Sequence, residues 1–162
     1  MVFPVQYKGG AALKGAIIFL TIVTLVLLDP SYVTAYISIN YEIVIIYIVC
    51  SLTLLYCLVS LIMYVMSYKS TEEDEEIRTT NSALAEIVFS CIGVIGWMLV
   101  CGIGGTVAQR TIIETGHRFG WMGACAGINA VLFVGIMGLF LSGLLKDKVF
   151  SPERRYKYAN RM

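Results

Sequence analysis

The stretch that decides the fold is FGWMGACAGINAVLFVGIMGLFLSGLL, Phe119 to Leu145, which contains no charged residue. A helix of this length and polarity can cross a bilayer. On a helical projection its small residues share one broad face, opposite Met122, Phe133 and Phe140. The residues on that face are Gly120, Gly123, Ala124, Gly127, Ala130, Gly135, Gly138 and Ser142. Because helices in lipid associate by close van der Waals contact, this face, with the GxxxG spacing of Gly123 and Gly127, predicts a packing interface.

The rest of the chain has the same apolar character. Of its 162 residues, 58% are hydrophobic and only 14% are charged, which is too few charges to cover a soluble domain of this size. The charges cluster, so that four apolar runs remain between them. We therefore predict an all-α membrane protein, in which residues 1–162 form a single four-transmembrane-helix bundle with a basic tail. The expected helices cover about residues 11–28, 43–68, 83–108 and 119–145, and the tail covers residues 146–162.

The first apolar run admits a second interpretation. Lys8 and Lys14 precede it, as basic residues precede the apolar core of a cleaved signal peptide. The sequence Val33-Thr34-Ala35 that follows is a poor cleavage site. We therefore expect the first run to be a membrane helix.

The third expected helix also carries a stripe of small residues. Seven residues, most of them small or polar, fall within one narrow face of this helix: Glu86, Ser90, Gly93, Trp97, Cys101, Gly104 and Ala108. The connection to the fourth helix, residues 109–118, is short enough only to join antiparallel neighbours. We predict a tightly packed hairpin of the third and fourth helices. The expected helix-packing residues are Gly93, Gly104, Gly120, Gly123, Gly127 and Gly138.

Lysine and arginine are distributed unevenly among the segments outside the expected helices. Residues 29–42 contain none, and residues 109–118 contain Arg110 and Arg118. The N-terminal segment contains two basic residues, the acidic segment 69–82 also contains two, and the tail contains six. The positive-inside rule therefore places the N and C termini and the acidic segment in the cytoplasm.

The sequence offers few groups for catalysis or for binding a metal. Its single histidine, His117, lies in an expected outer loop, and none of its five cysteines lies in such a loop. A disulfide-stapled extracellular domain and a Ser/His/Asp enzyme are therefore not expected. The run from Glu72 to Glu76 lacks the spacing and glycine of a calcium loop, so we interpret it as a solvated connection. We predict no catalytic, cofactor-binding or metal-binding residues.

Two polar side chains within the expected helices are candidate membrane contacts. Glu86 lies about one turn into the third helix, where it is either hydrated at headgroup depth or buried beside a cation. Lys14 and Lys146 lie at the right depth to pair with it. Asn129 points away from the glycine face of the fourth helix. Since an amide facing lipid would be unsatisfied, Asn129 predicts a second contact surface, within the bundle or with a partner.

With its short outer loops, the acidic connection Glu72–Glu76 and a brief basic tail, the whole chain resembles the Snakeskin-type four-span proteins of insect smooth septate junctions. It is more distantly similar to the four-span MARVEL-type proteins. The first resemblance implies a plasma-membrane protein at epithelial cell–cell junctions, with a structural role in the paracellular barrier. It also implies assembly with the single-span protein Mesh and a tetraspanin.

The sequence itself predicts lateral assembly with other integral membrane proteins, or with further copies of this chain, within the lipid bilayer. No nucleic-acid partner is expected. A membrane-trafficking or membrane-organising protein of the MARVEL type is one alternative, and a pore or transport subunit is another. A transporter would usually show broken helices or several polar groups converging at the membrane midplane, and the sequence indicates few of these.

Overall fold

The computed structural model describes four helices and the turn residue Leu28. Its backbone covers residues 5–28, 41–69, 75–110 and 115–150, and its side chains cover residues 8–28, 41–66, 83–108 and 117–145. The helices are α1 (Val5–Leu27), α3 (Tyr41–Lys69), α4 (Glu75–Arg110) and α5 (Thr115–Phe150). Of the loop expected at residues 29–42, residues 29–40 lie outside the described residues, and Tyr41 and Glu42 belong to α3. The acidic residues 72–74 and the tail from residue 151 also lie outside the described residues.

Each of the four helices contains a segment long and apolar enough to cross a membrane. The segments are Lys8–Leu27, Tyr41–Met66, Ala83–Ala108 and His117–Leu145, of 20, 26, 26 and 29 residues. At 1.5 Å of rise per residue, about 20 residues cover the hydrocarbon core of a bilayer. The predicted four-helix architecture is therefore confirmed, with helix boundaries within a few residues of those expected for the apolar segments.

The longer helices extend beyond their apolar segments, and here two expected loops are wrong. Helix α4 begins at Glu75, so Glu75, Glu76 and the residues up to Ser82 are helical rather than part of a loop. Helix α5 begins at Thr115, which shortens the expected connection at residues 109–118. Polarity ends a membrane span but does not end a helix, because Glu, Arg and Ala favour helical backbone in water as well.

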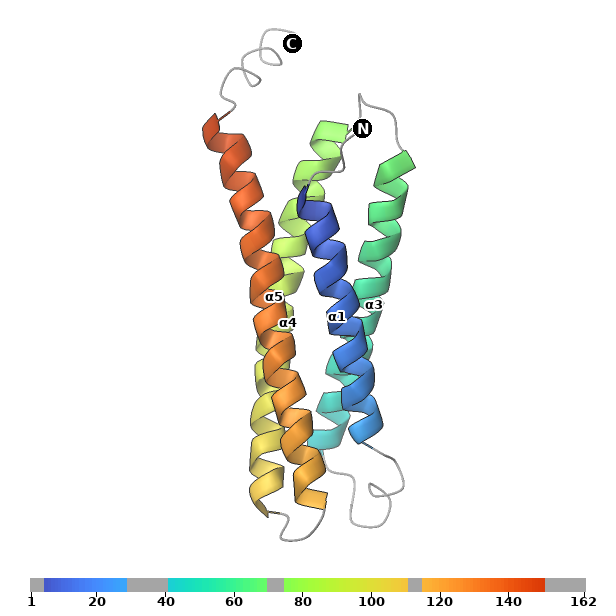
Figure 1. Cartoon of the computed structure of the whole chain (residues 1–162), viewed down its shortest axis with the longest axis vertical. Helices are drawn as coiled ribbons and strands as arrows, with labels where there is room; N and C mark the ends of the chain where they lie inside the picture. The colour runs from blue at the N-terminus through green and yellow to red at the C-terminus, as the bar shows by residue number, and fades with distance from the viewer. Residues whose placement is uncertain (1–4, 29–40, 70–74, 111–114, 151–162) are drawn as a thin grey trace, which may run out of the picture.

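The helices form a four-sided bundle (Figure 1). Helix α5 packs against α4 and α1, while α3 packs against α1 and α4. The contact between α4 and α5 is the most extensive of the four, and that between α3 and α4 is the least. The first residues of α1 and the last residues of α5 lie at the same end of the bundle (Figure 1).

Glycines bring α4 and α5 together, as the two small-residue stripes predict. A Cβ atom on Gly104 would lie 2.9 Å from the Cα of Gly123, which is closer than such atoms approach in proteins. A Cβ atom on Gly93 would lie 2.7 Å from the ring of Phe133. Gly104 thus marks a backbone-to-backbone approach, and Gly93 makes room for an aromatic ring of the facing helix.

The predicted packing face of α5 is wrong for part of its length. Gly120 and Gly138 are exposed, and within the described part of the chain no atom of another helix lies within 4 Å of where their Cβ atoms would be. Gly127 meets only the Cys101 sulfur, at an ordinary 3.7 Å. The face expected to point away supplies the buried side chains instead, namely Met122, Phe133, Ile136 and Phe140.

The shape of a four-sided bundle explains this difference. Two neighbouring helices can touch through glycines along their line of closest approach. The centre between four helices is wider than that line, so large side chains must fill it to reach the packing density of a protein interior. Helix α5 therefore turns Phe133 and Phe140 inward and leaves much of its glycine face on the outside.

Gly104→Ala should lower the stability of the protein by about 1–3 kcal/mol, because the new methyl group would meet the backbone of Gly123 rather than a movable side chain. Gly105→Ala is the matched control. Gly105 is the next residue of α4, is exposed, and has no other described helix within 4 Å of its Cβ position. Thermal unfolding in one mild detergent compares the two variants. Equal melting temperatures would contradict the closest approach at Gly104.

Candidate functional site

The inward faces of α1, α3 and α4 carry polar side chains at helical spacing. On α1 and the turn residue that follows it, the buried side chains are three or four positions apart, namely Lys14, Ile17, Thr21, Thr24 and Leu28. The buried positions of α3 are Ile46, Cys50, Thr53, Cys57, Ser60 and Tyr64, and those of α4 include Glu86, Ser90, Trp97 and Val100. The spacing places each set on one face of its helix, directed at the bundle centre.

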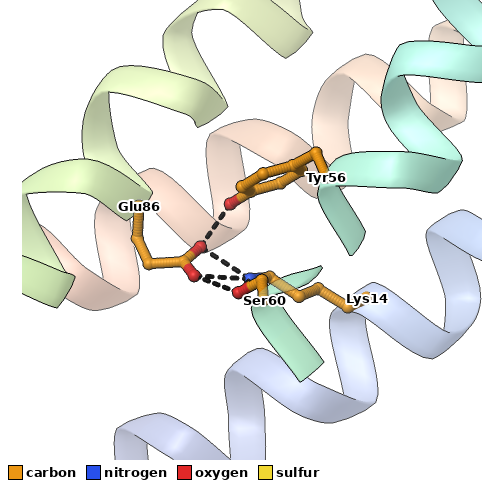
Figure 2. Close-up of polar contacts among 4 residues, drawn as sticks. All are labelled: Lys14, Tyr56, Ser60 and Glu86. Atoms are coloured by element: carbon orange, nitrogen blue, oxygen red, sulfur yellow. Dashed lines mark hydrogen bonds and ion pairs between the residues drawn. The ribbon is translucent and has the colours of Figure 1, made fainter. Parts of the chain in front are cut away.

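An ion pair lies where these three faces meet. The Lys14 ammonium on α1 is 2.6 Å and 2.7 Å from the two carboxylate oxygens of Glu86 on α4. The Lys14 side chain is 0% exposed and the Glu86 side chain is 6% exposed. Figure 2 shows both side chains reaching toward the same point as Tyr56 and Ser60 of α3. The pair is thus enclosed by helices on three sides.

Two hydroxyl groups of α3 complete the hydrogen bonding of the pair. Ser60 accepts a hydrogen bond from Lys14 and donates one to the Oε1 atom of Glu86. The hydroxyl of Tyr56 donates to Oε2 of Glu86. Each carboxylate oxygen of Glu86 therefore accepts one hydrogen bond from a hydroxyl group and one from the ammonium group. A buried pair is favourable only when its remaining hydrogen-bonding positions are filled in this way.

Aromatic rings cover the ammonium group. The Lys14 nitrogen lies 4.6 Å from the ring centre of Tyr56 and 4.5 Å from that of Tyr64. Both distances are within the range of cation–π attraction, which is stronger when the cation is removed from water. The site therefore neutralises the ammonium with a carboxylate and also surrounds it with polarisable surface.

The site is built to hold helices together. A single charge within a membrane span is costly, and the pairing of Lys14 with Glu86 cancels that charge. The atoms of the site meet only when the three contributing helices are in one register. The pair therefore fixes the position of α1, α3 and α4 along one another. The site is therefore a structural contact between helices, and its polar atoms bond to one another.

The sequence identified part of this site. Glu86 is buried, and of the two lysines proposed as its partner the structure pairs it with Lys14. The side chain of Lys146 lies outside the described residues. The roles of Tyr56 and Ser60 were missed. The pattern that could have identified them is the repeat of hydroxyl residues, three or four positions apart, along one face of an otherwise apolar helix.

Asn129 lies within the bundle. It is 0% exposed, and its Nδ2 atom is 3.5 Å from the hydroxyl oxygen of Thr21 on α1. Thr21 in turn donates to the carbonyl of Ile17, one turn earlier, at 2.7 Å. The second contact surface indicated by Asn129 is therefore α1 of the same chain. The side of α5 opposite its glycines is the interior of the bundle, so Asn129 does not face a partner.

A shallow apolar cavity of about 410 Å³ lies on the outside of the α4–α5 hairpin. It is lined by Val94, Met98, Cys101, Gly127, Ala130, Val131 and Val134. Gly127 thus borders an open groove, where the sequence predicted a close-packed interface. Its lining offers contact area and almost no polar groups.

Lys14→Met and Glu86→Gln each leave one buried charge without its partner, and each should destabilise the protein by about 3–5 kcal/mol. The double variant Lys14→Met/Glu86→Gln removes both charges, so its loss should be smaller than the sum of the two single losses. Thermal unfolding of the parent and the three variants in detergent gives the coupling energy. Additive losses would mean that the two charges do not depend on each other.

No family model, no curated protein and no solved structure matches the chain. Any assignment of a role therefore rests on the residues and contacts of this chain. These contacts form a bundle of four helices that are long and apolar enough to cross a membrane, with an ion pair enclosed between three of them.

Proposed function

We propose that this chain is a non-enzymatic structural protein of the plasma membrane that acts by lateral assembly with other membrane proteins. More specifically, we propose a role at epithelial cell–cell junctions of the smooth septate type, where such assemblies support a paracellular barrier. Its partners would be integral membrane proteins, of the Mesh and tetraspanin kinds that the sequence resemblance implies.

The observation that carries the assembly proposal is the uncovered glycine face of α5. Gly120, Ala124, Gly138 and Ser142 are exposed along the outside of this helix. Glycine weakens a helix relative to alanine, and an outward position offers no packing within the monomer to offset that loss. A backbone from another membrane helix could approach such a face closely, which is how small residues promote association in lipid.

The interior of the bundle favours assembly over transport. The charged side chains Lys14 and Glu86 are bonded to each other and to Ser60 and Tyr56. Trp97 donates to Thr53 at 3.1 Å, which uses a further pair of buried polar groups. Polar groups that satisfy one another in this way stabilise helix contacts, whereas a substrate pathway needs polar groups that face the substrate.

Gly138→Leu should reduce the recovery of co-purifying membrane proteins several-fold, because the leucine would hold a partner helix away from α5. Gly15→Leu on α1 is the matched control. Both glycines are exposed, and in the described part of the chain neither has another helix within 4 Å of its Cβ position. Both variants should therefore keep the melting temperature of the parent protein.

The measurement is affinity purification in mild detergent from epithelial cells, combined with imaging of the protein at cell borders. Loss of partners with Gly138→Leu alone supports assembly through α5. Equal recovery with both variants would contradict it. Normal assembly without enrichment at cell–cell contacts would leave lateral assembly standing and refute the junctional role.

The N and C termini should both lie in the cytoplasm, because basic residues concentrate in the C-terminal tail and an even number of spans returns the N-terminus to the same side. The start of α1 and the end of α5 lie at one end of the bundle, as this topology requires (Figure 1). Epitope tags placed before Met1 and after Met162 should be labelled by antibody only after cells are permeabilised. Labelling of either tag on intact cells would overturn the proposed orientation.

A further inference from the structure

We infer that α3 and α4 together form a receptor site for a primary ammonium group, and that Lys14 of α1 is its tethered occupant. Among the described residues, the groups that bond to the Lys14 ammonium or place a ring over it belong to these two helices. Glu86 of α4 supplies the carboxylate, and Ser60, Tyr56 and Tyr64 of α3 supply a hydroxyl group and two aromatic rings. Helix α1 contributes only the ligand.

The chemistry of the site matches an alkylammonium ion. Two carboxylate oxygens at 2.6 Å and 2.7 Å balance the charge and accept N–H bonds. The Ser60 oxygen accepts a further N–H bond. The ring centres at 4.6 Å and 4.5 Å present π faces, which attract a desolvated cation. An ammonium group has three N–H donors and no acceptor, so these partners suit it completely.

The walls of the site are held by contacts that do not involve Lys14. The hydroxyl groups of Tyr56 and Ser60 orient the Glu86 carboxylate. The Tyr56 ring packs on Phe89 and Phe133, with ring centres 5.3 Å and 6.1 Å away. The Tyr64 ring packs on Phe140 with a centre distance of 6.4 Å. Removal of the lysine side chain should therefore leave the receptor groups in place.

Helix α1 also has independent attachments to α5. Thr21 lies beside Asn129, and the side chain of Leu139 comes within 2.8 Å of the position that a Cβ atom on Gly9 would take. The contact of α1 with α5 is more extensive than its contact with α3. Truncation of Lys14 to alanine should thus leave α1 beside the receptor, with a void the shape of the missing propylammonium group.

Chemical rescue tests this inference in the full-length protein. The variant Lys14→Ala is unfolded thermally in mild detergent with increasing n-propylammonium chloride, and with sodium chloride at matched ionic strength. We expect a lower melting temperature than the parent protein, recovered by about half or more in a saturable manner by propylammonium. The parent protein, whose site is already occupied by Lys14, should show no such rise.

Two controls separate the site from general effects of the amine. The variant Lys14→Ala/Glu86→Gln lacks the carboxylate and should not respond to propylammonium. The neutral analogue n-propanol should not rescue Lys14→Ala. A folded Lys14→Ala protein that shows no response would overturn the receptor assignment. The same rise in the double variant, or with n-propanol, would also overturn it.

The inference stays testable if Lys14→Ala alone does not fold. In that case the variant is expressed and solubilised with and without propylammonium, and the monodisperse fraction is measured by size-exclusion chromatography. The amine should raise that fraction several-fold for Lys14→Ala and leave it unchanged for Lys14→Ala/Glu86→Gln. An equal fraction with and without the amine would refute the inference.

Discussion

The pairing of Lys14 with Glu86 is the constraint on which the arrangement of three helices depends. A lysine within an apolar helix has to reach a carboxylate or the headgroups, or it remains an isolated charge in a medium that solvates charge poorly. The only geometry that brings the ammonium to 2.6 Å from Glu86, with Ser60 and Tyr56 beside it, is one register of α1 against α3 and α4. The ion pair therefore sets the register of α1 against α3 and α4, while the contacts of Thr21 and Gly9 with α5 hold α1 beside the bundle.

Different interactions hold α4 to α5 and α3 to the rest of the bundle. Helices α4 and α5 meet through glycine backbones, where dispersion between many closely spaced atoms supplies the attraction. Helix α3 is joined by polar bonds spread along its length. Tyr47 donates to the carbonyl of Leu28 near one end, Trp97 donates to Thr53 near the middle, and Glu86 accepts from Tyr56 and Ser60 nearer the other end. The contacts of α3 with its neighbours are the least extensive in the bundle. Directional hydrogen bonds fix the position of α3 along its neighbours, which such small packing contacts alone would not do.

The sequence predicted the helices well and their orientation less well, for a reason specific to membranes. Long charge-free runs identify spans, and a carboxylate such as Glu86 inside one of them is a candidate for burial beside a cation. Rotation of α5 about its axis could not be predicted in the same way, because apolar residues surround this helix and lipid is as apolar as the protein core. Phe133 was therefore placed on the wrong side, and Gly138 with it. Asn129 was the better indicator, since a buried amide marks the protein-facing side more reliably than glycine does.

The separation of Lys14 and Glu86 in the sequence has a consequence for synthesis. The two residues are 72 positions apart, so α1 leaves the ribosome well before its counter-charge exists. At about 5–20 residues per second, the delay is roughly 4–14 s. During that interval the ammonium of Lys14 lacks its carboxylate, although α3 with Ser60 and Tyr56 is made before Glu86. The ion pair between Lys14 and Glu86 can therefore form only after α4 has been made, so the register of α1 against α3 and α4 is set late in synthesis.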